Sequence, residues 1–401
     1  MNEISTGDPT RDLAQNLRGW RKRRGLTQAE LAIAAKVSKS LVQKIEQGIA
    51  GQTTLETVHR LAIALKVPTT ELVGAHGDAR EPHTSTVLPP EVWEQTGRAL
   101  AGKFGYPDEE PTVAGVSSAL DSLKPLLAGN QYREVAHLLP SLIRDADALN
   151  GAGRGIRSRV LNTAGWVLTQ VRQFELAGAT LHHARDAAED HLDEAAAVNT
   201  LVWLRLREGR LDDARRLATE WADRIEPRMS RATERELTLW GRLVLGISNA
   251  AVRDNRPGEA ADTIRLAQTA ATAVGREVLS DTSTTRTFGP VTVAMIRAEN
   301  AAVQDRPDEV LRIAERIPAG GGLLVATSAS RNRHRLDVAS ALVSTRRSDE
   351  AVAVLTDLAS HSPQWLSQQR YAKDVVGRIV GRRRTLSTGM RTLADLTGVV
   401  L

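Results

Sequence analysis

The chain has 401 residues, enough for two or three domains, and it contains no cysteine, which excludes disulfides, thiolate metal sites and cysteine nucleophiles. Aromatic residues are only 3% of the total and alternating β-branched runs are rare, so we expect an all-α protein. The formal net charge is +5, and basic residues outnumber acidic ones in residues 1–76 and 370–391. Basic ends of this kind are typical of proteins that bind nucleic acid.

Residues 26–48 predict two short helices joined by a tight turn. Thr27 and Glu30 form a capping box, so a helix is expected to begin at Gln28. Ser38 supplies a second N-cap, and apolar residues at helical spacing give each helix a buried stripe. The outer face of the second helix carries cationic and hydrogen-bonding side chains of the kind that contact phosphates and base edges in the major groove: Lys39, Ser40, Gln43 and Lys44. The alternative is a helical hairpin used only for packing; the agreement of the capping box, the second cap and the polar outer face favours the DNA-reading interpretation.

This stretch resembles the helix-turn-helix of the Xre family of bacterial and phage repressors, without a gap over residues 28–47. The resemblance extends from about Asp12 to Val73 and implies a five-helix domain like that of lambda repressor within residues 1–76. It further implies that Gln28 contacts a phosphate, and that the following side chains face bases or nearby backbone: Ser38, Lys39, Ser40, Gln43 and Lys44. The sequence departs from the family at Lys36, where a glycine with positive φ is usual; a left-handed lysine costs roughly 1 kcal/mol.

Two further features complete the N-terminal part. Thr53 and Glu56 predict a capping box at the start of a fourth helix, and Pro68 predicts the start of a short fifth one. Residues 77–90 are polar, contain proline and show no helical period, which predicts a linker.

Residues 91–401 repeat themselves. Six times a helix-sized stretch ends in a short turn and a new helix begins, at Gln131, Gln173, Arg210, Arg256, Arg306 and Arg347. Four residues after each of these stands an apolar residue where the second helix of a pair approaches the first: Val135, Ala177, Ala214, Ala260, Val310 and Ala351. The pattern is similar to degenerate tetratricopeptide repeats. It implies an α-solenoid whose concave face is lined by the first helix of each pair.

Asparagine and tryptophan recur at matching positions of two neighbouring repeats. Asn162 and Trp166 lie 15 and 11 residues before the apolar turn residue of their repeat, and Asn199 and Trp203 lie at the same distances before the next one. In tetratricopeptide proteins such positions face a ligand, and here an asparagine could bind a peptide backbone while a tryptophan offers an apolar surface. The alternative is that the tryptophans pack between repeats and the asparagines lie at the surface.

The polar stretch from Leu279 to Pro290 interrupts the helical pattern. Long polar loops in compact arrays are often binding loops, although a disordered insertion is the commoner explanation. Residues 288–303 resemble a segment of regulators that join an Xre head to a tetratricopeptide body in GC-rich bacteria. By position we expect Arg286, Arg297 and Asn300 to face the concave side, where they could hold an anionic group.

Other motifs point away from catalysis. The sequence has no HExxH, Walker, GxSxG or GxGxxG motif and its nine histidines are scattered, so we expect no enzyme activity, no metal and no cofactor. No window approaches the roughly 18 apolar residues of a membrane span, and with the lack of cysteine this predicts a cytoplasmic protein without membrane contact. The basic run at residues 381–391 is either a solvated helix end or, less commonly, a second DNA contact.

Together these features predict a DNA-binding transcriptional regulator whose residues 91–401 form a sensor and dimerisation domain. The expected partners are a double-stranded operator, a second copy of the chain, and a peptide or small-molecule effector. The alternative hypothesis is an interaction scaffold whose repeats bind a protein partner, with DNA binding used for autoregulation. The sequence does not specify the effector, the operator, or whether transcription is activated or repressed.

Overall fold

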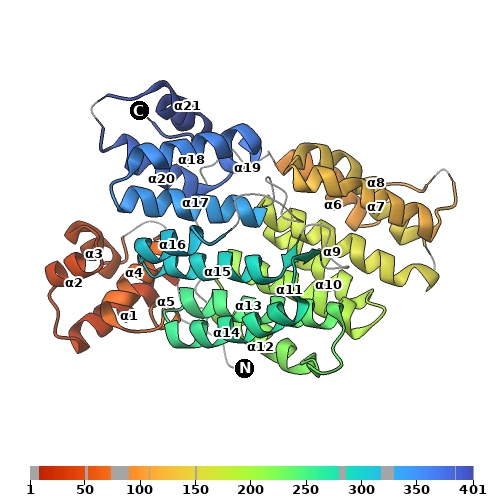
Figure 1. Cartoon of the computed structure of the whole chain (residues 1–401), viewed down its shortest axis with the longest axis horizontal. Coiled ribbons are helices and arrows are strands. Elements are labelled where there is room, and N and C mark those ends of the chain that lie inside the picture. The colour runs from red at the N-terminus through yellow and green to blue at the C-terminus, as the bar shows by residue number, and fades with distance from the viewer. Residues whose placement is uncertain are drawn as a thin grey trace, which may run out of the picture.

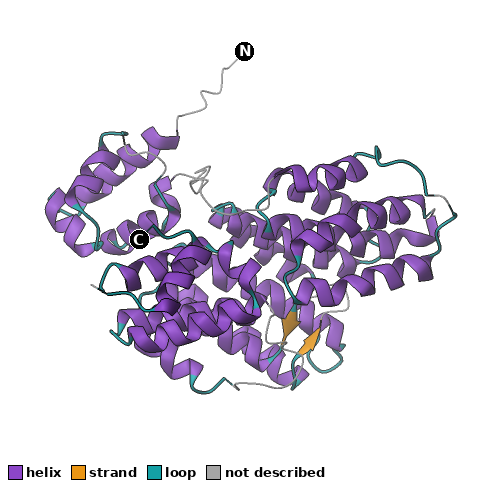
Figure 2. Ribbon diagram, turned by 90° about the horizontal axis from the view of Figure 1, so that it is seen from above, coloured by secondary structure: helices purple, strands orange, loops and turns teal. Residues whose placement is uncertain are grey.

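The computed structural model describes residues 9–49, 53–73, 90–107, 109–149, 151–279, 286–317, 329–383 and 385–400. Within these residues the chain is helical apart from one two-stranded ribbon (Figures 1 and 2), which confirms the all-α prediction. Among the described residues, no helix is both long and apolar enough to cross a membrane.

The N-terminal domain consists of five helices: α1 (Pro9–Arg23), α2 (Gln28–Ala34), α3 (Lys39–Glu46), α4 (Leu55–Leu65) and α5 (Thr70–Val73). Their apolar stripes meet in one core in which the side chains of Leu17, Leu31, Val42, Leu61 and Leu65 have no solvent exposure. The domain therefore has its own hydrophobic centre, as expected of a unit that folds around a helix-turn-helix.

The N-cap of α4 corrects one local prediction. The hydroxyl of Thr54, not that of Thr53, accepts a hydrogen bond from the backbone N–H of Thr57 at 3.2 Å. Glu56 then lies at the second helical position and pairs with Arg60 instead of closing a capping box. Two adjacent threonines offer the same cap chemistry, and the extended backbone of Thr54 determines which one is used.

The predicted linker, residues 77–90, lies outside the described residues except for Pro90, so the domain boundary stays a prediction. Beyond it the chain begins with a 3₁₀ turn (Pro90–Trp93) and α6 (Glu94–Leu100). The remaining helices are α7 (Val113–Ala128), α8 (Tyr132–Ala148), α9 (Arg154–Gln170), α10 (Phe174–Asp186), α11 (His191–Arg207), α12 (Leu211–Arg224), α13 (Glu234–Arg253), α14 (Pro257–Val274), α15 (Pro290–Val303), α16 (Pro307–Ala314), α17 (Ala329–Ser344), α18 (Ser348–His361), α19 (Pro363–Ser367), α20 (Arg370–Val380) and α21 (Thr388–Thr397).

The repeat turns lie where the sequence predicts them. Each predicted turn residue is the N-cap of the second helix of a pair, from Gln131 before α8 to Arg347 before α18. The residue before each cap has φ between 55° and 79°, which ends the first helix by a left-handed step: Asn130, Arg172, Gly209, Asn255, Asp305 and Arg346. The six apolar residues that follow the caps are at most 1% exposed. The chain is thus a tetratricopeptide-like α-solenoid after its N-terminal domain.

The solenoid has two layers. The helices α9, α11, α13, α15 and α17 contact one another in that order, and we call them the first-helix layer. Their partners α10, α12, α14, α16 and α18 cover them (Figure 1).

The polar stretch after α14 forms a β-ribbon in which β1 (Val278–Leu279) pairs antiparallel with β2 (Thr287–Phe288). Residues 280–285 between them lie outside the described residues. Phe288 has no solvent exposure, so the end of this stretch belongs to the core.

Arginines near the C-terminus hold α20 against the preceding pair of helices. Arg378 donates to the hydroxyl of Ser340 at 2.6 Å, and Arg382 donates to the carbonyl oxygen of Val343 at 2.9 Å. Arg383 forms an ion pair with Asp349 at 2.6 Å. Of the predicted basic run, the two arginines described at its start therefore make contacts inside the solenoid.

Candidate DNA-binding helix and ligand-binding residues

The two helices of the motif start at the predicted caps. Glu30 N–H donates to the hydroxyl of Thr27 at 3.2 Å, and the Glu30 carboxylate accepts from Thr27 N–H at 2.7 Å. The pKa of Glu30 lies below its usual value, because the backbone N–H of Thr27, and after it the Thr27 side chain, favour the ionised carboxylate. Ser38 caps α3 by accepting from Leu41 N–H at 3.1 Å. The predicted helix-turn-helix is therefore present, with α3 as its second helix.

The outer face of α3 is open to solvent. Lys39, Ser40 and Lys44 are exposed and Gln43 is half-buried, so the predicted base-reading side chains lie together on one surface. The hydroxyl of Ser38 accepts the cap bond through its oxygen, so its O–H remains a donor that a phosphate could accept from.

Gln28, whose phosphate contact stays a prediction of the family resemblance, also makes a contact within the domain. Its amide donates to the Glu46 carboxylate at 2.8 Å, and Arg21 binds the same carboxylate through Nε at 2.5 Å and Nη2 at 2.9 Å. Burial alone would raise the pKa of Glu46, but the hydrogen bonds from Arg21 and Gln28 lower it below its usual value. This hydrogen-bonded ion pair connects α1 and α3, and the amide of Gln28 adds α2 to it.

The turn before α3 carries the predicted left-handed lysine, since Lys36 has a φ of 54°. Its ammonium group forms an ion pair with Asp305, the left-handed residue between α15 and α16. The turn of the DNA-binding motif therefore contacts a turn of the solenoid.

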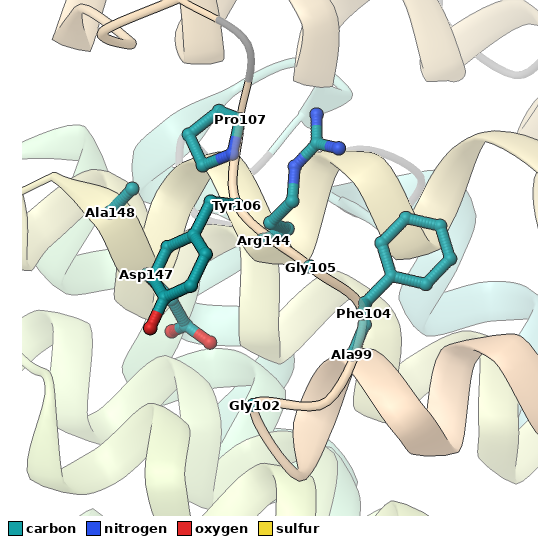
Figure 3. Close-up of a pocket in the computed structure, with 9 residues that line it drawn as sticks. All are labelled: Ala99, Gly102, Phe104, Gly105, Tyr106, Pro107, Arg144, Asp147 and Ala148. Atoms are coloured by element: carbon teal, nitrogen blue, oxygen red, sulfur yellow. The ribbon is translucent and has the colours of Figure 1, made fainter.

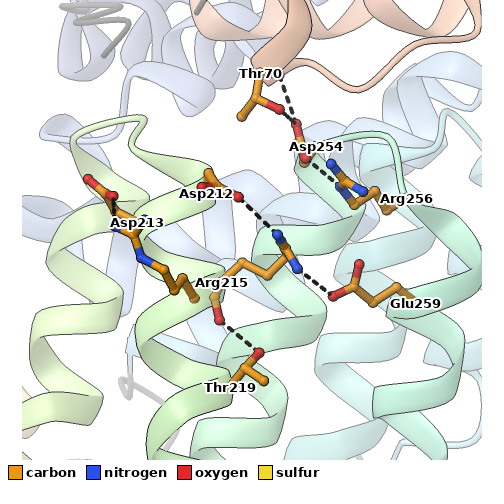
Figure 4. A network of polar contacts seen from close by, with 9 residues as sticks. Thr70, Asp212, Asp213, Arg215, Thr219, Asp254, Arg256 and Glu259 are labelled. Atoms are coloured by element: carbon orange, nitrogen blue, oxygen red, sulfur yellow. Dashed lines mark hydrogen bonds and ion pairs between the residues drawn. The ribbon is translucent and has the colours of Figure 1, made fainter. Parts of the chain in front are cut away.

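A second and more buried contact joins the two domains at α5. Thr70 donates to the Asp254 carboxylate from its backbone N–H at 2.8 Å and from its hydroxyl at 2.9 Å (Figure 4). Asp254 is 1% exposed and also binds Arg256 at 2.7 Å. The hydroxyl of Thr69 donates to the carbonyl oxygen of Arg253 at 2.7 Å, and Asn255 donates to the carbonyl oxygen of Val67 at 3.0 Å. The turn between α13 and α14 thus caps α5 from outside the domain.

The predicted asparagine and tryptophan positions come together on α9 and α11. The rings of Trp166 and Trp203 stack with centroids 6.3 Å apart and an interplanar angle of 25°. Asn162 and Asn199 are 5% and 8% exposed, so neither lies at the surface. Trp203 is half-buried and presents part of its ring outside the core.

Of the three residues predicted from the stretch after α14, one joins this group. The guanidinium of Arg286 lies 5.3 Å from the Trp203 ring centroid and donates to the carbonyl oxygen of Asn199 at 3.4 Å. Asn300 lies on α15 and donates to the Ser248 hydroxyl at 2.8 Å, while its own Oδ1 is buried without a hydrogen-bond partner. Arg297 is 61% exposed and lies 3.9 Å from Glu309 of α16. The structure does not bring Arg297 to the tryptophan pair.

A buried ionic cluster crosses the first-helix layer beyond the tryptophans. Arg253 of α13 pairs with Glu299 of α15, and Arg333 of α17 lies 3.7 Å from Glu299 and 3.3 Å from Asp337. Burial raises the pKa of Asp337 above its usual value. For Glu299 burial acts in the same direction, but the charges of Arg253 and Arg333 outweigh it and lower the pKa. The cluster links three repeats, and its first member also binds Thr69 through its carbonyl oxygen.

A surface pocket of about 190 Å³ lies near the start of the solenoid, between α8 and the segment after α6 (Figure 3). Phe104, Tyr106, Arg144 and Asp147 line it. Arg144 already pairs with Asp145 at 2.8 Å, and Asp147 pairs with Arg157 at 2.6 Å. The pocket therefore offers no charged group that lacks a partner.

Sequence reasoning missed the charged residues inside the first-helix layer. Arg242, Glu299 and Arg333 stand in helices whose neighbours are largely buried, and a charge within such an apolar stretch was the available signal. For Asp254 the sequence signal was weaker, because acidic residues are also common before repeat turns that lie at the surface.

Residues 12–73 match the family model described as a helix-turn-helix domain. With the exposed outer face of α3, this match defines the chain as a DNA-binding regulator whose helix-turn-helix domain precedes a tetratricopeptide-like solenoid. Among curated proteins none matches the chain.

Solved structures similar to the chain include PlcR of Bacillus thuringiensis in complex with the peptide PapR7 and DNA, at 13% identity, covering 76% of this chain and 97% of that one, with a TM-score of 0.34. Another is the apo form of the competence regulator ComR from Streptococcus vestibularis, at 9% identity, covering 83% of this chain and 99% of that one, with a TM-score of 0.31.

Proposed function

We propose that the protein is a cytoplasmic, sequence-specific transcriptional regulator that reads an operator through α3. The observation that carries this proposal is the exposed face of Lys39, Ser40 and Lys44 on the second helix of a capped helix-turn-helix. A helix of this kind lies in the major groove, where lysines contact phosphates and short polar side chains contact base edges.

The DNA-reading proposal is tested with the full chain and an operator selected from random sequence. Ser40→Ala with Gln43→Ala is expected to lower the preference for the operator over random DNA. Lys39→Ala with Lys44→Ala is expected to weaken binding to both and to reduce the slope of log K against log salt by about one for each lost phosphate contact. Arg60→Gln, on an exposed part of α4, is the matched control. Operator binding that is the same in all variants would contradict the assignment.

We further propose that the regulator is a homodimer. One recognition helix gives little affinity, and two-fold dimers read half-sites separated by about one helical turn. Analytical ultracentrifugation and footprinting check this proposal, because a dimer is expected to protect a near-palindromic site. A monomer that protects a single half-site at full affinity would refute it.

We propose that the solenoid binds the effector. The stacked pair of Trp166 and Trp203, with Asn162 and Asn199 beside it, offers an apolar surface next to amide groups, which suits a peptide or a small organic molecule. Binding there acts on the DNA-binding domain because the same row of helices ends in turns that hold Thr69, Thr70 and Lys36. An effector that prefers one arrangement of the repeats therefore shifts the orientation of the recognition helices.

The input is tested with the double substitution Asn162→Ala and Asn199→Ala. We expect the variant to lose the effect of cell extract or peptide mixtures on operator binding while keeping operator affinity without them. A response that survives the substitution would remove these residues from the site. If a stoichiometric protein is captured and the only operator is the protein's own promoter, the solenoid is instead an interaction scaffold.

A further inference from the structure

The turn between α17 and α18 carries a group of arginines that meet around one carbonyl oxygen. The backbone N–H of Arg346 donates to the carbonyl oxygen of Val343 at 3.2 Å. The guanidinium of Arg382, directly after α20, donates to the same oxygen at 2.9 Å. Arg347 and Arg383 follow these two arginines in the sequence. Four arginines from two distant segments therefore lie at one turn, and we call them the arginine cluster.

Acidic residues neutralise only half of the arginine cluster. Arg347 and Arg383 each pair with an exposed carboxylate of α18, at 2.7 and 2.6 Å. Arg346 and Arg382 are exposed, and within the described parts of the chain no carboxylate lies at ion-pair distance from either of them. Four arginines and two acids leave a net charge of +2 on this surface.

The contacts that hold the cluster place its charge without cancelling it. Arg382 uses one guanidinium N–H group for the carbonyl oxygen of Val343, and its other donors remain available on an exposed side chain. Arg378 fixes the end of α20 from below, through its hydrogen bond to Ser340 at 2.6 Å. Arg346 has a φ of 65°, and its side chain projects from a turn that these bonds hold in position. The positive charge is thus preorganised at the surface.

The row of repeat turns leads from the DNA-binding domain to this cluster. Asn255, Asp305 and Arg346 occupy the same left-handed position in three consecutive turns. The first contacts Val67 after α4, and the second contacts Lys36 before α3. Because α15 and α17 pack directly on each other, the Arg346 turn lies one helix spacing of about 8–10 Å beyond the Asp305 turn. Figure 1 shows this order, with α17, α18 and α20 above α3.

A spacing of this size suits the DNA backbone next to the bases that α3 reads. Duplex DNA carries one phosphate charge for about every 1.7 Å of its axis, so a step of about 8–10 Å passes several phosphates. DNA in contact with α3 extends beyond both ends of this short helix. Guanidinium groups bind phosphate oxygens through paired N–H donors and are less strongly hydrated than an ammonium group. The charge, the position and the side-chain chemistry of the cluster therefore agree with a phosphate contact.

We propose that the turn between α17 and α18, together with the end of α20, is a second DNA-binding surface in which Arg346 and Arg382 bind phosphates beside the bases read by α3. This inference rests on the proposed reading of an operator by α3, and it makes the solenoid part of the DNA-binding surface. Phosphates are the same at every sequence, so this contact increases affinity for any duplex and leaves the preference for the operator unchanged.

The salt dependence of DNA binding tests the proposal with the full-length protein, the selected operator and a random duplex of the same length. Arg346→Gln with Arg382→Gln is expected to weaken binding to both duplexes and to reduce the slope of log K against log salt by about two. Arg228→Gln with Arg231→Gln is the matched control, because it removes the same charge from exposed residues between α12 and α13, at the opposite edge of the solenoid. A slope that is unchanged in the first variant, or reduced equally in the control, would overturn the proposal.

Phosphate ethylation interference locates the contact on the operator. In the wild-type protein we expect interference at phosphates beside the bases whose recognition is lost in Ser40→Ala with Gln43→Ala. The double arginine variant is expected to lose this interference and to keep the interference next to α3. Absence of the flanking interference from the wild-type pattern would contradict the assignment.

A single substitution guards against loss of folding. The side chain of Arg346 forms no hydrogen bond or ion pair within the described residues, so Arg346→Gln keeps the contacts of the turn and should reduce the slope by about one. Tighter binding by this variant would show that the cluster obstructs DNA, and the proposal would be wrong. The slope on random duplex is measured whether or not any operator is preferred, so failure of operator reading and failure of this contact are distinguished.

Discussion

The bond between Thr70 and Asp254 allows a direct test of whether the solenoid holds the DNA-binding domain. Thr70→Val keeps the shape of the side chain and removes only the hydroxyl that donates to the Asp254 carboxylate at 2.9 Å. A hydrogen bond to a charged group contributes about 1.5–3 kcal/mol. The backbone N–H of Thr70 and the guanidinium of Arg256 still bind the carboxylate, so the loss lies at the low end of this range. Docking should weaken by about 1.5 kcal/mol, which is roughly tenfold in its equilibrium constant.

Native-state hydrogen exchange measures this change at α5. The amide of Leu72 donates to the carbonyl oxygen of Thr69. It exchanges with solvent when α5 separates from the turn between α13 and α14 and opens. We expect Thr70→Val to accelerate its exchange about tenfold, a factor that follows from the docking free energy. Thr219→Val is the control, because Thr219 donates to a carbonyl oxygen within α12 and does not contact the domain (Figure 4). Unchanged exchange at Leu72, or the same acceleration in the control, would refute the reasoning.

Two further predictions concern stability. Burial, followed by the charge of Arg331, lowers the pKa of His334 to about 4. In the unfolded chain the imidazole binds a proton near pH 6.5, so the contribution of His334 to stability is fully present above that pH and is lost as the pH falls toward 4; the loss is about 2 kcal/mol at pH 5. Urea unfolding at pH 8 and at pH 5 measures this difference in stability. If His334→Asn shows the same difference between the two pH values as the wild-type protein, the assignment to His334 is wrong. Gly241→Ala pushes a Cβ into Phe288 and should cost at least about 1–3 kcal/mol in urea unfolding. Gly178→Ala, whose Cβ would meet its nearest neighbour at 3.7 Å, should not destabilise, and equal losses in both would contradict the packing argument.

The repeat turns were predictable because their chemistry is local. A cap residue, an acid in the first turn and a small residue four positions on recur at every turn, and helical geometry relates them without reference to distant contacts. The neighbouring positions of Trp166 and Trp203 follow from the same register, since equal offsets in adjacent repeats bring side chains together. Likewise the caps Thr27 and Ser38 are short-range features, and both form the predicted bonds.

What the sequence did not predict depends on distant contacts. Arg242 and Thr287 are 45 residues apart and come into contact because a β-ribbon packs on α13, and the two short strands carry too little alternation to be recognised. The contact of Asp254 with Thr70 spans 184 positions and joins two domains. The amide hydrogen bond of Gln28 to Glu46 was likewise not predicted, because it depends on how α1, α2 and α3 pack in this chain.

The left-handed residues at the repeat turns have a consequence for how the protein transmits a signal. Asn255 and Asp305 occupy the same position in two consecutive repeats, and both contact the DNA-binding domain, the first at Val67 and the second at Lys36. The DNA-binding domain therefore contacts two neighbouring repeats of one superhelix. Forming both contacts together restricts the relative rotation of those repeats. We therefore expect a small change in superhelical pitch, distributed over many helices, to break one of these two contacts and keep the other.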